Sequence, residues 1–280
     1  MLRVLKGQPC VLSVPRDTKP TSATVTITRD RDAASIVSAA SCTTEADRVT
    51  YSLAAQATVS ALTAVFTIVD GNGTSTVTVP VSVVGNRTAS ITDCRRLRPL
   101  DDVNRYPDEL IEHAITTVED QLEAACGVSF VPVERVDVLL DGNGTTELFT
   151  RHARPQSISA VSITDNVVTQ ALTQTDIDAM RLDEEAGVIL RPTYPWQQGR
   201  RNITLTGVFG YATVPGLVRQ AVPEAVRHVL VESRIDARAQ SITNEDGTAQ
   251  LVTAGVRGAM FSLPVLNQCV QMYKQSFGVA

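Results

Sequence analysis

The sequence lacks the clusters of side chains that mark disulfide-rich and metal-binding proteins. Its 280 residues include five cysteines, an odd number, and no two of them form a CxxC or CxC pair. A disulfide framework or a zinc site requires such clustered pairs. The histidines His113, His152 and His228 have no second ligand at helical spacing. We therefore predict no metal site, and we expect the cysteines to be small buried side chains in a reducing cytosol.

Motifs for catalysis and for phosphate binding are missing as well. The sequence contains no GxxxxGK[ST], no GxSxG, no HExxH and no GxGxxG between a strand and a helix. The neighbouring acids Asp183 and Glu184 have no partner base at an informative spacing. The sequence thus predicts no catalytic residues, no cofactor and no enzyme activity.

Long apolar runs and an excess of positive charge are also absent. No run reaches the roughly 18–20 residues of a membrane span, and the first residues do not resemble a secretion signal. The formal charge is −5, which disfavours nucleic-acid binding through bulk positive charge. With 43% hydrophobic and 20% charged residues, the chain is too apolar to be disordered. Its length suggests about two domains, and we expect no association with membranes.

Residues 1–90 alternate between apolar and polar side chains, the pattern of half-buried strands. The alternation is clearest at 23–28 and 77–83. A DGNG sequence occurs at 70–73 and again at 141–144. It could indicate a calcium loop, but the distal glutamate is missing, and Asp-Gly and Asn-Gly suit hairpin turns better. We predict an antiparallel, immunoglobulin-like β-sandwich for 1–90.

A connector is predicted at 91–106, with three arginines, Arg95, Arg96 and Arg98. Two interpretations stay open for them. Either they contact phosphate or an acidic neighbour, or they belong to a solvated linker and pair with nearby charges.

The third predicted segment, 107–280, begins with the clearest helix of the chain. Apolar residues recur every three or four positions over 107–126, and Gly127 is a natural stop. A second helix is predicted at 214–238, where Pro223 should cause a kink or a restart. A third should begin near Pro264 and end near Gln275, and 240–258 is either a mobile arm or a hairpin. We expect strands between the first two helices, at 133–140, 145–150, 158–163, 167–172, 186–190 and 203–209, with one helical turn at 177–182. The strands 133–140 and 145–150 should form a hairpin across the DGNG turn, and 158–163 should form a second hairpin with 167–172.

Several strings in this segment resemble a known family. Tyr106 to Ile111, followed by VEDQLEAACGVSFVP at 118–132, is similar to the opening helix of the head–tail adaptors of long-tailed bacteriophages. These proteins are also called head-completion or connector proteins. The string GYATVP at 210–215, which opens a helix, resembles the family's second signature. The resemblance covers about residues 100–280.

The resemblance implies a fold and a place in a virion. The first 90 residues do not belong to the family's minimal core. The whole chain would then be α+β, with the β-sandwich predicted above followed by a helical-bundle adaptor domain that carries inserted β-hairpins and a C-terminal arm and helix. Identical subunits, usually twelve, would form a ring between the portal and the tail-side connector, or stopper. Genomic double-stranded DNA would pass through without sequence-specific binding. The protein would be assembled in the host cytoplasm and would act at the head–tail interface of the virion.

Two sets of residues are candidates for contacts in such a ring. Acidic residues on one face of the first helix could line the channel or contact a neighbouring subunit: Glu112, Glu119, Asp120 and Glu123. An acidic lumen would keep DNA phosphates from binding. Apolar residues near the C-terminal helix could dock on the portal: Leu263, Leu266, Val270 and Tyr273.

An alternative function is that of a binding or decoration module. In this hypothesis the β-sandwich recognises a host surface or a virion partner, and the rest of the chain is an anchor. Carbohydrate sites commonly present Trp or Tyr for stacking. Residues 1–90 contain no Trp and a single Tyr, Tyr51, which favours protein docking over sugar binding.

Overall fold

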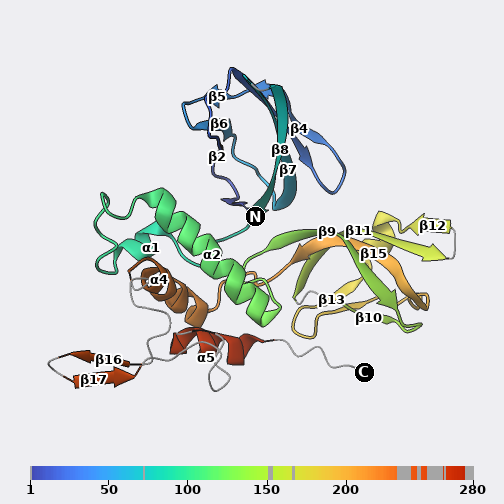
Figure 1. Ribbon diagram of the computed structural model, residues 1–280. Coiled ribbons are helices and arrows are strands. Elements are labelled where there is room, and N and C mark those ends of the chain that lie inside the picture. Colours follow the sequence, from blue (N-terminus) through green and yellow to red (C-terminus); the bar gives the residue numbers. More distant parts are fainter. Residues whose placement is uncertain are drawn as a thin grey trace. The chain divides into compact units, whose positions relative to one another are not determined.

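A computed structural model describes most of the chain (Figure 1). The described residues are 2–71, 73–150, 154–165, 168–231, 261 and 263–274, together with the backbone of 241–244 and 247–250. Two compact units are present, and each combines two separate segments. Unit 1 comprises Met1–Asn86 and Val131–Ala212, and unit 2 comprises Arg87–Phe130 and Thr213–Ala280. The units group segments by their contacts, whereas the sequence predicts consecutive domains at 1–90 and 107–280 joined by a linker. These domain boundaries stay a prediction.

The first segment of unit 1 consists of two sheets around a shared core. The larger sheet has the order β1 (Leu2–Leu5), β8 (Gly73–Val84), β7 (Ser60–Asp70), β3 (Ser22–Arg29) and β4 (Ser35–Ser41). The smaller has the order β2 (Cys10–Pro15), β6 (Arg48–Leu53) and β5 (Thr43–Thr44). Side chains from both sheets, among them Leu12, Leu53 and Phe66, form one buried cluster. The period-2 pattern thus correctly indicated strands with one buried face.

The pairing of β1 corrects the predicted sandwich. β7 and β8 form the expected hairpin, with Asp70 opposite Gly73. β1, however, runs parallel to β8, with Leu2 opposite Val81. The expectation of a wholly antiparallel sandwich is therefore wrong, and its immunoglobulin-like character is not confirmed. Alternation identifies a strand and its buried face, but it does not reveal the direction of the neighbouring strand.

The second segment of unit 1 also folds as two sheets. One has the order β12 (Val168–Ala171), β11 (Pro155–Asp165), β15 (Gly199–Phe209) and β9 (Val133–Gly142). The other has the order β10 (Glu147–Phe149), β14 (Val188–Leu190) and β13 (Arg181–Asp183). The helix α3 (Gln174–Asp178) lies between β12 and β13 in the chain. Trp196, Ile203 and Leu205 are completely buried in the core of this segment.

One of the two hairpins predicted here is confirmed and the other is wrong. β11 and β12 pair in an antiparallel manner as expected, with Asp165 opposite Val168. β9 does not pair with β10, although the DGNG sequence lies between them, because β9 pairs with β15 and β10 pairs with β14. The predicted helical turn at 177–182 is also displaced. Thr173 caps α3 earlier in the chain, where its hydroxyl accepts a hydrogen bond from the amide of Asp176.

Unit 2 contains the remaining helices. They are α1 (Ile91–Arg95), α2 (Asp108–Cys126), α4 (Gly216–Val231) and α5 (Pro264–Tyr273). α2 ends where predicted, because Gly127 adopts a left-handed conformation at φ 71° and its amide donates to the carbonyl of Glu123. α2 and α4 pack against each other, and both contact α5. β16 (Ser241–Asn244) and β17 (Gly247–Gln250) pair as a hairpin, one of the two alternatives for 240–258.

The helices do not form the expected helical-bundle domain, so the predicted fold class is wrong. The described part of the chain is mainly β, and its helices are few. The strands at 131–212 are not hairpins inserted into a bundle, because they have a core of their own and group with residues 1–86 in unit 1. Of the two expectations for Pro223, a kink or a restart, the restart does not occur. α4 continues through Pro223, which is buried beside Val222 on the packed face, so packing compensates for the lost hydrogen bond.

A buried carboxylate connects the two segments of unit 1. Glu134 on β9 is 4% exposed. Its Oε2 accepts a hydrogen bond of 2.8 Å from the backbone amide of Ala61, at the start of β7. Its Oε1 lies 3.4 Å from a guanidinium nitrogen of Arg31. The carboxylate thus satisfies a main-chain donor and a cation from the N-terminal sheets.

This contact predicts an unequal effect of two substitutions. Glu134→Ala removes the acceptor and leaves a buried amide without a partner, so it should lower the free energy of unfolding by about 3 kcal/mol. Arg31→Ala removes only a partly exposed partner and should cost about 1 kcal/mol or less. Urea unfolding followed by circular dichroism measures both values. Equal losses for the two variants would contradict the assigned role of Glu134.

Candidate functional site

The four acidic residues predicted to form one face of α2 lie in different environments. Glu112 and Asp120 are exposed. Glu123 is half-buried, and its carboxylate accepts a hydrogen bond of 3.1 Å from the amide of Phe130. Glu119 is 1% exposed. Only Glu112 and Asp120 are thus open to solvent, and a continuous acidic surface that includes Glu119 is excluded.

Glu119 forms the centre of a buried polar cluster in unit 2. Its Oε1 accepts hydrogen bonds from the backbone amide of Thr88, at 3.0 Å, and from the Thr88 hydroxyl. Its Oε2 lies 3.5 Å from Nε of Arg87. The same guanidinium donates to the hydroxyl of Thr116 at 3.2 Å and lies 3.7 Å from the carboxylate of Glu112. The cluster holds residues 87–88 against the middle of α2.

Helical periodicity alone could not separate Glu119 from Glu112. Seven residues correspond to nearly two full turns, so the two side chains share one stripe of the helix. Residues 87–88 cover the turn that carries Glu119 and leave Glu112 at the rim, with its side chain 56% exposed. The signal that was missed is the string Arg87-Thr88, a cation beside a hydroxyl, which is suited to a buried carboxylate.

The residues predicted to dock on the portal pack largely within unit 2. Leu266 is 6% exposed and Val270 is 7% exposed, and both lie on the inner face of α5. Tyr273 contacts the ring of Phe130 edge to face, with ring centroids 5.6 Å apart. Leu263 is half-buried at the start of the helix. These side chains attach α5 to the rest of unit 2, and the portal contact stays a prediction.

The three arginines of the predicted connector do not act together. Arg95 donates hydrogen bonds to the carbonyl oxygens of Leu100 at 2.6 Å and Tyr106 at 2.8 Å, and it pairs with Asp108 at the start of α2. Arg96 is exposed, 3.4 Å from Asp93, and Arg98 is exposed. Arg95 therefore fits the interpretation of local charge pairing, and it orders the segment between α1 and α2.

Three of the five cysteines are buried, as predicted. Burial raises the pKa of the Cys94 thiol to about 12 and those of Cys126 and Cys269 to about 11. Cys10 and Cys42 are half-buried. Thiols with such raised pKa values carry almost no thiolate at neutral pH and are poor nucleophiles.

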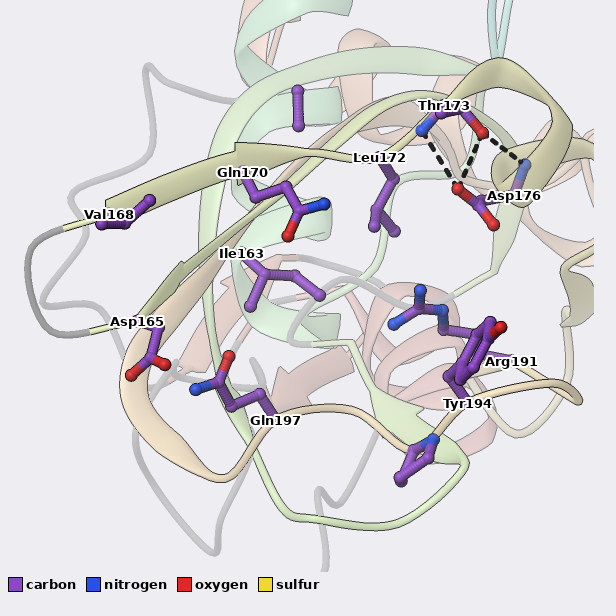
Figure 2. Close-up of a pocket in the computed structure, with 12 residues that line it drawn as sticks. Ile163, Asp165, Val168, Gln170, Leu172, Thr173, Asp176, Arg191, Tyr194 and Gln197 are labelled. Carbon is purple, nitrogen blue, oxygen red and sulfur yellow. Dashed lines mark hydrogen bonds between the residues drawn. The ribbon is translucent and has the colours of Figure 1, made fainter.

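A groove in unit 1 is a concave site lined by described residues (Figure 2). Its volume is about 650 Å³. One side is formed by β11, β12 and the start of α3, and the other by the loop from Arg191 to Gln197. The lining residues are Ile163, Asp165, Val168, Gln170, Ala171, Leu172, Thr173, Asp176, Arg191, Tyr194, Pro195 and Gln197.

Backbone hydrogen bonds hold the loop side of the groove in place. The amide of Arg191 donates to the carbonyl of Thr146, and the amide of Trp196 donates to the carbonyl of Thr145. The side chain of Asn202 accepts from the amide of Gly142 at 2.9 Å and donates to the carbonyl of Gln197 at 2.9 Å. A Cβ on Gly142 would lie 1.8 Å from that carbonyl oxygen, so only glycine fits there.

Arg191 is the chemically distinctive residue of the groove. Its guanidinium carbon lies 5.3 Å from the ring centre of Tyr194 and 5.7 Å from that of Trp196. Among the described residues, no carboxylate forms an ion pair with it. Asp176 accepts hydrogen bonds from the hydroxyl and the amide of Thr173, which lower the pKa of Asp176, and the positive charge of Arg191 lowers it further without forming an ion pair. The groove can therefore offer a cation and an aromatic ring to an anionic group.

In the part of the chain that the structure describes, no group of three or more His, Cys, Asp or Glu side chains is placed to hold a metal ion. No helix there is long and apolar enough to cross a membrane.

Comparison with known proteins gives little similarity. No family model matches the sequence, and no curated protein matches it. Among solved structures, a chain of the "Neck of empty GTA particle computed with C6 symmetry" is similar, with 11% sequence identity and a TM-score of 0.41. The match covers 66% of this chain and 89% of that chain. At this TM-score the likeness does not establish a shared fold.

Removing the Glu119 carboxylate should destabilise unit 2 far more than removing that of Glu112. Glu119→Ala leaves the buried Thr88 amide without its acceptor and removes the carboxylate beside Nε of Arg87, so a loss of about 3 kcal/mol is expected. Glu112→Ala removes an exposed partner and should change stability by less than about 0.5 kcal/mol. Thermal and urea unfolding measure the difference. A Glu119→Ala protein as stable as Glu112→Ala would show that the buried cluster is not formed.

The thiols should differ in reactivity. At pH 8, modification of Cys94, Cys126 and Cys269 by Ellman's reagent should be about 100-fold slower than that of a free thiol, because their thiolate populations are small. Cys10 and Cys42 should react faster, and all five should react together in urea. Mass spectrometry of the modified protein assigns each site. Rapid modification of Cys126 or Cys269 in the folded protein would contradict the described packing of α2 and α5.

Proposed function

We propose that the chain is a structural, non-catalytic subunit of a phage-like head–tail neck, which forms a homo-oligomeric ring between the portal and the tail-side connector. One observation carries the proposal. The two strings that resemble the head–tail adaptors lie at the ends of α2 and before α4, and these two helices pack against each other within unit 2.

Details of both strings support this proposal. Gly127 ends α2, and Phe130, which follows it, is completely buried and contacts Tyr273 of α5. After the second string, Val214 is buried immediately before α4. The strings therefore form the turns through which the chain enters and leaves the packed helices. Their resemblance to the adaptor family involves residues with defined structural tasks.

The exposed acids of α2 are the part of the predicted site that can act in a ring. Glu112 and Asp120 are exposed to solvent, whereas Glu119 is buried. In the proposed ring these two residues line the channel or contact the neighbouring subunit. Repeated negative charge around a channel lets DNA pass without adhering to its wall.

Sedimentation velocity tests this proposal on the full chain, alone and together with the portal protein of its particle. The wild type should form a closed multi-subunit assembly, alone or on the portal. The double variant Glu112→Lys, Asp120→Lys should reduce the assembled fraction about tenfold. The two reversed charges would then repel groups of the same sign at the subunit contact or along the channel.

The matched control changes the same charge on an exposed loop of unit 1, with Glu184→Lys and Glu185→Lys. It should assemble like the wild type. A wild-type protein that stays monomeric both alone and with the portal contradicts the proposed ring. Unchanged assembly of the Glu112 and Asp120 variant removes these two residues from the contact surface.

A further inference from the structure

Among the described residues, β12 is an edge strand with no strand on its outer side. It stands first in the order β12-β11-β15-β9, and in the described part of the chain β11 is its partner strand. All four of its residues, Val168–Ala171, are exposed. An edge of this kind presents backbone donors and acceptors that a further strand can use.

The register shows which backbone groups point outward. Asp165 pairs with Val168 and Ile163 pairs with Gln170, and the next amide along, that of Leu172, donates to the carbonyl of Val161 at 2.9 Å. Hydrogen-bonded and non-hydrogen-bonded pairs alternate in an antiparallel ladder. The amides and carbonyls of Val168, Gln170 and Leu172 therefore face β11. Those of Thr169 and Ala171 face outward.

The groove containing Arg191 lies beside this edge. Val168, Gln170 and Leu172 line one side of it, and Arg191 and Tyr194 stand across from them (Figure 2). On an added strand, side chains on one face would point the same way as Val168 and Gln170. Every second side chain of that strand would thus be directed toward the groove and the guanidinium of Arg191.

We propose that the outer edge of β12 binds an extended acidic segment of another protein, which adds as a strand and places a carboxylate on Arg191. The main-chain groups of Thr169 and Ala171 provide the pairing. The groove provides selectivity, because the Arg191 guanidinium forms no ion pair with a carboxylate of the described residues and lies near the rings of Tyr194 and Trp196. This mode of recognition combines backbone pairing with a pocket for alternate side chains.

Charge identifies the occupant as acidic. The acids that line the groove are Asp165 and Asp176. Asp176 already accepts hydrogen bonds from the amide and hydroxyl of Thr173, and Asp165 also has a partner. Arg191 is the positively charged residue of the lining, and its side chain forms no ion pair with the described residues. A carboxylate matches its planar donors in a bidentate manner. The proposal does not depend on the ring proposed above, since it concerns unit 1 alone.

The test uses the full chain and two synthetic peptides with capped ends. Both alternate threonine and valine, and one has a central glutamate where the other has glutamine. Nuclear magnetic resonance titration should show shifts of the Thr169 and Ala171 amides on addition of the acidic peptide. The glutamine peptide should bind about tenfold more weakly, because the charge-assisted hydrogen bonds are lost.

Two pairs of variants distinguish the contribution of backbone pairing at the β12 edge from that of the Arg191 charge. Ala171→Pro removes an outward donor and spares the pairing with β11, as proline does on strand edges, and it should weaken binding about tenfold. Ala171→Ser keeps the donor and should bind normally. Arg191→Ala should abolish the preference for glutamate over glutamine. Arg200→Ala, which removes an exposed arginine that does not line the groove, should preserve this preference.

Several results would overturn the proposal. They are equal affinity for the two peptides, binding unchanged in Ala171→Pro, or no binding of either peptide. Sedimentation of the chain without peptide could also give a result that overturns the proposal. A mass that increases with concentration in the wild type but not in Ala171→Pro would assign the edge to a second copy of this chain instead.

Discussion

The carboxylate of Glu119 holds together two parts of the chain that the packing of unit 2 requires to be adjacent. Residues 87–88 enter the unit from the N-terminal strands, and Glu119 binds the amide and hydroxyl of Thr88 and faces the Arg87 guanidinium. Glu134 performs the same task in unit 1, between β9 and the start of β7. In both cases a buried charge is tolerated because a main-chain donor and a cation satisfy it.

Because some acidic residues are buried in this way, they cannot form part of an assembly surface. A row of acids on α2 suggests a single charged face, but one of its members is an internal anchor and another binds the amide of Phe130. The exposed members, Glu112 and Asp120, and the edge of β12 with its groove are surfaces that other molecules can reach. The inner face of α5 is occupied by contacts within the chain, such as that between Tyr273 and Phe130.

Features determined by neighbouring residues could be predicted from the sequence. The apolar repeat and Gly127 defined α2, and the turns at 70–73 and 165–168 defined two hairpins. Features that depend on distant partners could not. The DGNG sequence at 141–144 has the composition of a hairpin turn, yet β9 pairs with β15 some 60 residues later, and Asn202 holds Gly142 there. The parallel pairing of β1 with β8 and the burial of Glu119 are of the same kind. The groove around Arg191 was not predicted, because its two sides come from β11–β12 and from a loop after β14.

Hydrogen exchange at the amide of Thr88 tests the central role of Glu119 most directly. This amide lies outside the helices and strands, so its protection depends on the Glu119 carboxylate. The account predicts that it exchanges only when unit 2 unfolds, as slowly as the core amides of α2. Exchange at the rate of an unprotected amide, in a protein whose α2 amides remain protected, would contradict the account.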